Sequence, residues 1–95
     1  LCIVVCTKGY PDKYKKNILI ENIDKIGLEK NEYCYHAGTK KIDNKTYSIG
    51  GRVINFVSLS ESFKESRNKI FNIIKSLNWD GGFFRKDIGY KVIDE

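Results

Sequence analysis

Residues 52–77 read RVINFVSLSESFKESRNKIFNIIKSL, and this stretch decides the fold. Its first part, residues 52–59, carries closely spaced apolar and β-branched residues, a pattern typical of a strand. The S-x-x-E sequence at residues 62–65 predicts a helix start, in which the Ser62 hydroxyl caps the first turn and Glu65 reaches back. Spacing of three and four residues then predicts the buried stripe of one amphipathic helix. The expected stripe contains Phe63, Ser66, Ile70, Ile73 and Leu77, widened by Phe71 and Ile74.

The residues before this stretch predict further strands. Residues 1–7 are apolar and β-branched, which is typical of a strand buried on both faces. Residues 32–36 alternate, with Tyr33 and Tyr35 on one face of a strand. Residues 43–45 have the composition of a hairpin turn, which leads into residues 46–49. Residues 18–26 are ambiguous between a short strand and one helical turn.

The residues after the helix predict its end and two more strands. Residues 78–82 contain the turn-forming residues that stop the helix, and short strands are expected at residues 83–85 and 89–93. The sum is a strand-rich α+β domain, in which an antiparallel sheet accompanies one main helix in the C-terminal half.

Length and composition exclude several classes of protein. Ninety-five residues, 41% hydrophobic and 31% charged, correspond to one globular domain. No apolar run approaches the roughly 20 residues that a membrane span requires. Because methionine is absent, we expect residues 1–95 to be a single domain cut from a longer protein. The net charge of +5 is compatible with phosphate-bearing small molecules and with nucleic acid alike.

The three cysteines predict reduced thiols in the cytosol, because their number is odd and no C-x-x-C pair occurs. Cys2, Cys6, Cys34 and His36 lack the spacing of a zinc site, so we expect no bound metal. Cys2 and Cys6 lie in an apolar run, which predicts that both pack in the core.

No complete catalytic set is present, and a single histidine next to a strand end is more often structural than a general base. Two candidate anion sites remain. Gly50-Gly51-Arg52 combines close backbone approach with a planar cation that suits a phosphate or carboxylate, although a tight turn explains the glycines equally well. Arg85 and Asp87 would contact an anion or another domain, or form a surface ion pair.

Five stretches, in order and in register, run through nearly the whole chain from about residue 3 to residue 92. They are Lys8-Gly9-Tyr10-Pro11, His36-Ala37-Gly38-Thr39, Gly50-Gly51-Arg52-Val53, Ser62-Phe63-Lys64-Glu65 and residues 79–90. Together they resemble the C-terminal domain of the phosphoribosylamine–glycine ligase (glycinamide ribonucleotide synthetase) family, within the ATP-grasp superfamily. Asp12 and Asn22 stand where that family usually has glycine, and both residue types tolerate left-handed backbone geometry.

The resemblance implies a part of a larger enzyme that joins glycine to phosphoribosylamine in de novo purine synthesis. That reaction cleaves ATP to ADP and phosphate through an acyl phosphate. ATP and Mg²⁺ would be bound by upstream ATP-grasp domains, which are this domain's implied partner, and no cofactor by the domain itself. Its sheet would be of the rudimentary hybrid-motif, barrel-sandwich-like kind. The resemblance also implies a wall of the active site, with substrate-facing residues Gly50, Gly51, Arg52, His36 and Thr39.

Two alternatives stay open. A small basic nucleic-acid-binding module would need exposed aromatic residues interleaved with cations on one strand face. Phe56, Phe63 and Phe71 instead fall in apolar patterns that predict core positions. The equivalent domain of another ATP-grasp carboxylase or ligase is the second alternative, and residues 85–89 are more typical of the glycine ligase. We therefore expect no nucleic-acid partner, no membrane partner and a cytoplasmic location.

Overall fold

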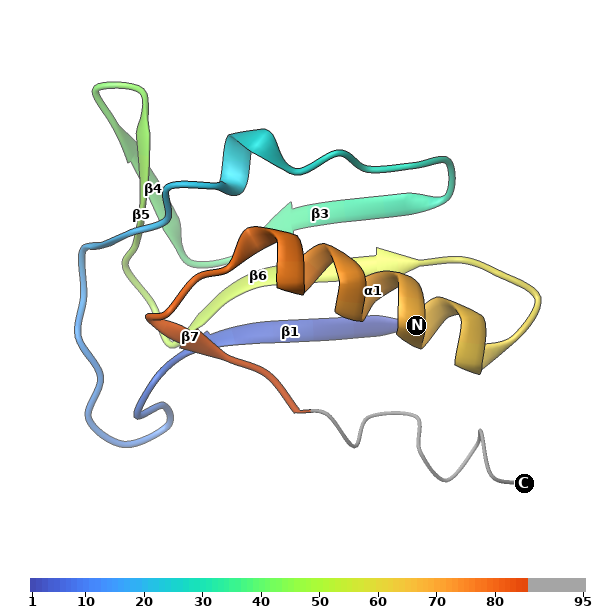
Figure 1. Ribbon diagram of the computed structural model, residues 1–95. Helices are drawn as coiled ribbons and strands as arrows, with labels where there is room; N and C mark the ends of the chain where they lie inside the picture. The colour runs from blue at the N-terminus through green and yellow to red at the C-terminus, as the bar shows by residue number, and fades with distance from the viewer. Residues whose placement is uncertain (86–95) are drawn as a thin grey trace.

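The elements of the fold are seven strands, one long helix and one short 3-10 turn within residues 1–85, the part that the computed structural model describes (Figure 1). Their bounds are β1 (Cys2–Thr7), β2 (Ile18–Leu19), η1 (Ile23–Lys25), β3 (Glu32–His36), β4 (Thr39–Ile42), β5 (Lys45–Ser48), β6 (Arg52–Ser58), α1 (Phe63–Leu77) and β7 (Gly82–Phe83). A four-stranded sheet has the order β3-β6-β1-β7, and a three-stranded sheet the order β2-β5-β4. All pairings are antiparallel, which confirms the strand-rich α+β prediction.

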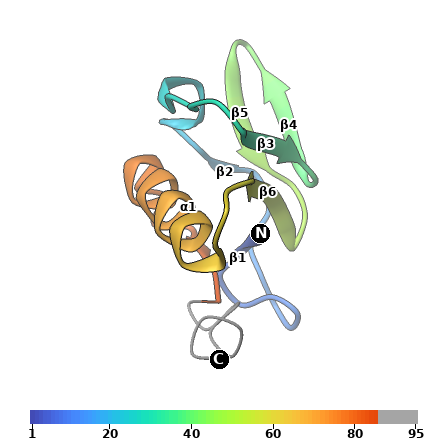
Figure 2. The same ribbon diagram turned by 90° about the vertical axis from the view of Figure 1, so that its right-hand side faces the viewer.

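Strand β6 is the centre of the larger sheet, between β3 and β1. Phe56 pairs with Ile3 on one side and with Cys34 on the other. Helix α1 covers the sheet face to which these residues belong, as Figures 1 and 2 show from two directions. Ile70 and Leu77 of α1 are buried with Phe56 in one hydrophobic core. The apolar stripe of the helix therefore packs against every second residue of the strands.

Strand β1 is buried on one face only, so the prediction of two-sided burial is wrong. Ile3, Val5 and Thr7 are buried, whereas Cys2 is exposed and Cys6 is half-buried. The apolar run suggested two covered faces, but in an antiparallel sheet with a helix on one side the residues of alternate parity point away from that helix.

Helix α1 begins as predicted, because the Ser62 hydroxyl accepts a hydrogen bond from the Glu65 backbone N–H at 3.1 Å. The reciprocal half of the motif is absent from this helix start. The Glu65 carboxylate lies instead 3.4 Å from the Lys69 ammonium, one helical turn further on. Phe63 is 49% exposed, so its predicted place in the core is wrong. As the first residue of the helix, it lies at the end of the stripe, where it lines a surface pocket with Leu1 and Ser58.

We predict that Ser62→Ala lowers the free energy of unfolding by about 0.5–2 kcal/mol, through loss of the capping hydrogen bond. Chemical denaturation measures this change. Ser76→Ala in the same helix is the control, because the Ser76 hydroxyl donates only to the Asn72 carbonyl of its own helix and should change stability by less than about 0.5 kcal/mol. Equal midpoints for the two variants would contradict a capping role for Ser62.

Helix α1 ends at an asparagine in left-handed geometry. Asn78 has φ 47° and ψ 50°, and its N–H donates to the Ile74 carbonyl. A second asparagine also serves this end: the Asn22 side-chain amide donates to the Leu77 carbonyl at 3.1 Å. Asn22 itself has φ −95°, so neither it nor Asp12 adopts the left-handed geometry that the family's glycines suggested.

The smaller sheet contains the clearest hairpin of the described chain. Strands β4 and β5 are joined by Asp43 and Asn44, with φ of 50° and 65°, the geometry of a type I′ turn. This confirms the predicted turn. Thr39 starts β4. The ambiguous residues 18–26 form β2 followed by η1.

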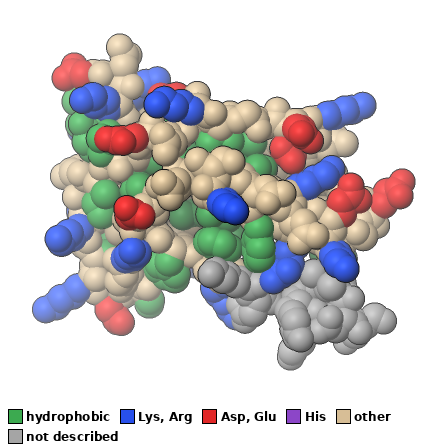
Figure 3. Space-filling view, viewed as in Figure 1, with side chains coloured by type: hydrophobic (Ala, Val, Ile, Leu, Met, Phe, Trp, Pro, Cys, Tyr) green, Lys and Arg blue, Asp and Glu red, His purple; other side chains and the backbone are tan. Residues whose placement is uncertain are grey.

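Charged side chains of both signs are scattered over the helix-bearing side of the molecule in Figure 3. The fifteen-residue α1 is the longest helix of residues 1–85, and no helix there is long and apolar enough to cross a membrane. The strand predicted at residues 89–93 lies outside the described residues.

Candidate functional site

Three of the sequence stretches meet at the end of the four-stranded sheet where β1 finishes and β6 starts. The Thr7 backbone N–H donates to the Gly51 carbonyl at 2.7 Å, and the Thr7 hydroxyl donates to the Gly50 carbonyl at 2.8 Å. The Gly38 N–H donates to the Val53 carbonyl at 3.0 Å, and the Gly38 carbonyl accepts from Ile49 at 2.9 Å. We call this region, residues 7–10, 36–39 and 50–53, the glycine corner.

The glycines of this corner are required by close approach. A Cβ on Gly51 would overlap the ring of Tyr10, which lies across that backbone. A Cβ on Gly38 would overlap the Arg52 carbonyl oxygen and lie 3.2 Å from the Gly50 Cα. Both positions therefore exclude a side chain for lack of space. The glycines allow three chain segments, distant in sequence, to come into backbone contact.

The five residues predicted to face substrate all lie in the glycine corner. His36, at the end of β3, places its Nδ1 atom 2.8 Å from the Thr39 hydroxyl at the start of β4. Gly50 and Gly51 contact Thr7 as described, and Arg52 begins β6 directly after them. The structure thus brings the predicted set together, while a substrate-facing role for these residues stays a prediction.

Arg52 presents its guanidinium at the surface of this corner. The side chain is exposed, and no hydrogen bond or ion pair to another residue within 1–85 involves it. Its positive charge lies near Cys6: burial raises the pKa of the Cys6 thiol, and Arg52 offsets part of that rise. A planar cation with free donors is suited to a carboxylate or phosphate.

The cysteines are free thiols in three different environments. Cys2 is exposed, so its predicted place in the core is wrong, because Cys2 lies on the sheet face opposite α1. Cys6 and Cys34 are partly buried, and burial alone raises the pKa of the Cys34 thiol. Among residues 1–85, no three side chains of His, Cys, Asp or Glu gather closely enough to share a metal ion.

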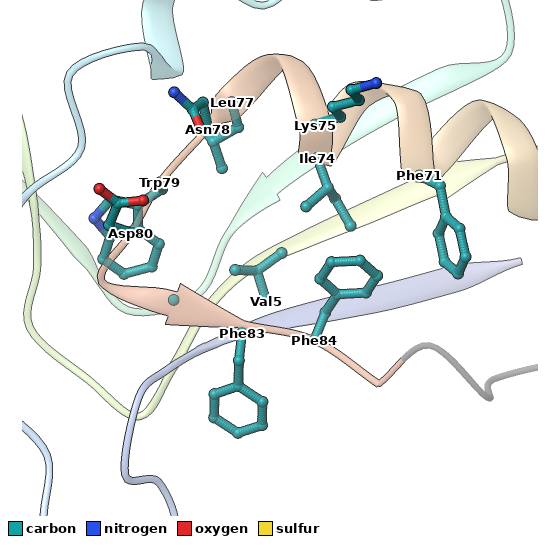
Figure 4. A pocket seen from close by; sticks show the side chains of 11 residues that line it. Val5, Phe71, Ile74, Lys75, Leu77, Asn78, Trp79, Asp80, Phe83 and Phe84 are labelled. Atoms are coloured by element: carbon teal, nitrogen blue, oxygen red, sulfur yellow. The ribbon is translucent and has the colours of Figure 1, made fainter.

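Residues 79–82, which begin the last of the five stretches, lie beside the glycine corner, because Gly82 pairs with Thr7 at the end of β1. The Trp79 indole N–H donates to the Leu19 carbonyl at 3.1 Å, and the Gly81 carbonyl accepts from Lys8 at 3.0 Å. An apolar cavity of about 410 Å³ lies between this segment, α1 and β1. Figure 4 shows Val5, Ile74 and Phe84 directed into it, whereas Phe83 points away.

An open pocket of about 730 Å³ beside the first loop is a feature that sequence reasoning missed. Lys8, Lys13 and Lys15 line it together with the single carboxylate of Asp80. In the sequence, residues 13–17 are basic and polar, which is typical of a solvated loop. The lining is predominantly apolar, so the lysine side chains contribute mainly their methylene stems to it.

The second predicted anion site is not assembled within the described chain. Arg85 is exposed at the end of the described residues, and Asp87 lies outside them. Their proposed contact with an anion or another domain therefore stays a prediction.

Comparison with known proteins shows to which family this chain belongs. The family model described as "Phosphoribosylglycinamide synthetase, C domain" matches residues 1–91. The chain belongs to this family. The C domain thus extends over nearly all of the sequence, and the resemblance carried by the five stretches is confirmed.

Curated relatives and a solved structure agree with this assignment. The phosphoribosylamine–glycine ligase of Caldanaerobacter subterraneus is 38% identical over 88 residues, which cover 93% of this chain and 20% of that protein. The ligase of Vibrio parahaemolyticus is 36% identical over 91 residues, 96% of this chain and 21% of that protein. The crystal structure of phosphoribosylamine–glycine ligase from Thermotoga maritima matches with a TM-score of 0.70 and 27% identity, covering 88% of this chain and 20% of that chain. The C domain therefore spans about one fifth of the relatives it matches.

Two exposed tyrosines are relevant to the alternative that this chain is a nucleic-acid-binding module. Tyr33 and Tyr35 are 41% and 55% exposed, so the aromatic residues of this chain are less fully used by the core than the sequence suggested. Their cross-strand neighbours Val57 and Asn55 are uncharged. Single-strand binding requires cations interleaved with such rings, and these positions supply none.

Proposed function

We propose that this C domain is the C-terminal part of a longer, cytoplasmic ligase that joins glycine to phosphoribosylamine with hydrolysis of ATP. The observation that carries the proposal is the family match over residues 1–91, together with relatives of that name at 29–38% identity. In such a reaction the glycine carboxylate is activated as an acyl phosphate, and the amine of phosphoribosylamine then displaces the phosphate. Glycinamide ribonucleotide, ADP and phosphate are the products.

We assign ATP and Mg²⁺ to the other domains of that longer chain. Mg²⁺ requires oxygen ligands such as carboxylates in near-octahedral arrangement, and residues 1–85 do not gather such a set. The sequence also lacks the glycine-rich loop with Lys-Ser or Lys-Thr that cradles phosphates. The contribution of the C domain is accordingly to pack on the ATP-grasp core and to form part of the wall around the substrates.

The glycine corner is the part of the C domain that we propose faces substrate. Arg52 projects from it with donors that have no partner within residues 1–85. Gly50 leaves the backbone beside Arg52 without a side chain, so that an anion can approach closely there, whereas Gly51 is buried beneath the Tyr10 ring and allows the tight packing of the corner. The hydrogen bond between His36 and Thr39 holds the neighbouring turn in place. We therefore propose that Arg52 binds a substrate anion, either the ribose phosphate or the glycine carboxylate.

Arg52→Lys in the full-length ligase tests this role, because it keeps the charge but loses the bidentate fork. We expect a rise of about tenfold in the KM of one substrate, equivalent to about 1.4 kcal/mol, at unchanged stability. Steady-state kinetics with each substrate varied in turn, and thermal unfolding, measure the two quantities. Lys64→Arg on the exposed side of α1 is the control and should change neither. A lower melting temperature with normal kinetics would show that Arg52 is structural.

The proposed function as a whole is tested by comparing the full-length chain with the isolated C domain. We expect the full-length chain to release ADP and phosphate only when ATP, Mg²⁺, glycine and phosphoribosylamine are all present. The 95-residue C domain alone should release no phosphate above the blank. Turnover by the isolated domain, or a full-length chain that ignores glycine, would refute the proposal.

A further inference from the structure

The four-stranded sheet has a second face, opposite α1, that carries a compact set of uncharged side chains. Cross-strand partners point to the same side of a sheet, so the strand register defines two rows on this face. One row is Tyr33, Val57 and Cys2, and the other is Tyr35, Asn55 and Val4. We call these six residues the open sheet face. Beyond a bulge after Val5 the register continues with Cys6 opposite Arg52, where this face borders the glycine corner.

This face points away from α1, because successive side chains along a strand point to opposite faces of the sheet. Ile3 and Val5 of β1 are buried in the core under α1. Cys2 and Val4 alternate with them in sequence and therefore point the other way. Figure 2, which shows the sheet from its end, places α1 on one side of β1 and β6. Among residues 1–85, no second helix covers the other side.

The composition of the open sheet face is unusual for a surface in contact with water. None of its six residues is charged, in a chain that is 31% charged. Tyr33 and Tyr35 are 41% and 55% exposed, and their rings stack with centroids 6.3 Å apart and an interplanar angle of 17°. A solvated face of an antiparallel sheet normally carries polar residues at alternate positions. Depletion of charge combined with exposed tyrosine is typical of the core of a protein interface.

The related ligases are much longer than this domain. The C domain matches 20–22% of the ligases compared with it, so most of each relative lies outside the matched region. A neighbouring domain of the same chain is available at high effective concentration and needs no separate association step. A nucleic acid would require cations interleaved with the rings, whereas Arg52, the cation next along this register, lies beyond the end of the two rows.

We propose that the open sheet face docks against the remainder of the longer ligase chain, and this rests on the proposed function only in requiring such a chain. The partner surface is apolar and uncharged, with hydrogen-bonding groups placed for the two tyrosine hydroxyls. The face that packs on the ligase core is thus the one opposite α1, while the charged outer side of α1 stays in solvent.

Cysteine labelling of the full-length chain tests the docking directly. Tyr35→Cys provides a reporter at the centre of the open sheet face, and Asn68→Cys on the exposed side of α1 is its matched control. The rate of alkylation at each position is measured by mass spectrometry on the native protein. We expect Tyr35→Cys, and the native Cys2, to react at least about tenfold more slowly than Asn68→Cys, because access limits thiol alkylation. Equal rates would overturn the proposal.

A charged substitution on the open sheet face provides a second test of the docking. Tyr33→Glu should open the docked face and raise the labelling rate of Cys2 by about tenfold, since an unpaired charge cannot stay buried there. Phe63→Glu introduces the same charge at an exposed aromatic residue of α1 and should leave Cys2 unchanged. If Tyr33→Glu does not fold, the uncharged Tyr35→Cys reporter still decides the question.

The labelling also distinguishes docking within one chain from contact with a second copy, and it distinguishes the docking proposal from the proposed function. Protection of Cys2 that disappears on dilution would identify a second copy as the occupant and overturn docking within one chain. Protection that persists on dilution supports docking within one chain. Labelling requires no substrate, so a protected face in a chain without ligase activity would refute the proposed function alone. An active chain with an unprotected face would refute the docking alone.

Discussion

Phe56→Ala is expected to lower the free energy of unfolding by about 3–5 kcal/mol, the largest effect of any single substitution considered for this domain. Phe56 is fully buried at the centre of β6, between Ile3 and Cys34 on the neighbouring strands. Removing its ring leaves a cavity under α1 that a two-layer domain of this size has little means of filling. Urea denaturation followed by circular dichroism measures the change.

Phe63→Ala is the matched control for this prediction. The same chemical change at a side chain that is 49% exposed should cost less than about 0.5 kcal/mol. The pair also tests a correction made by the structure, because the sequence pattern assigned both phenylalanines to the core. A large loss of stability for Phe63→Ala would restore the sequence-based assignment and contradict the position of the helix start.

Gly38→Ala should destabilise the domain by about 1–3 kcal/mol, the cost of forcing a methyl group into a well-packed region. The added Cβ would overlap the Arg52 carbonyl oxygen and crowd the Gly50 Cα, both of which are backbone atoms that cannot rotate away. The glycine corner would have to open, and with it the hydrogen bond from Gly38 to Val53. Chemical denaturation of the variant gives the size of the effect.

Gly27→Ala distinguishes this steric effect from the general effect of replacing glycine. A Cβ at Gly27 meets no atom within 4 Å, and its φ lies outside the left-handed region. We expect this variant to be neutral or more stable by up to about 1 kcal/mol, because alanine reduces the freedom of the unfolded chain. Similar losses for the two variants would show that close approach at Gly38 is unimportant.

Local patterns predicted those elements whose signals lie within a few residues of one another. The cap at Ser62, the asparagine stop after Leu77 and the turn at Asp43 and Asn44 each depend on neighbouring residues, and all three are confirmed. Short-range hydrogen bonds and backbone preferences suffice for such features. The two-residue alternation that put Tyr33 and Tyr35 on one face also held, because strand periodicity is itself local.

Errors arose where the environment of a residue depends on a distant segment. The apolar run of β1 contained no indication of which face α1 would cover, so Cys2 was assigned to the core although it is exposed. Phe63 continued the helical spacing, but at the first position of the helix it is largely exposed. Glu65 had two partners within reach, and the lysine one turn later is the one that it contacts. Hydrophobicity alone does not say where a neighbouring layer ends.

The candidate site likewise combines features that are local in sequence with contacts between distant segments. Its residues were identifiable in advance, because glycine pairs followed by arginine are chemically distinctive and the five stretches match a family in order and spacing. Their convergence was not identifiable, since the contacts of Thr7 with Gly50 and of Gly38 with Val53 join segments more than ten residues apart. Chain order therefore identifies the family and the local elements of this C domain. The antiparallel pairing of β1, β3 and β6 creates the glycine corner and the open sheet face, because only pairing in space sets which side chains share a surface.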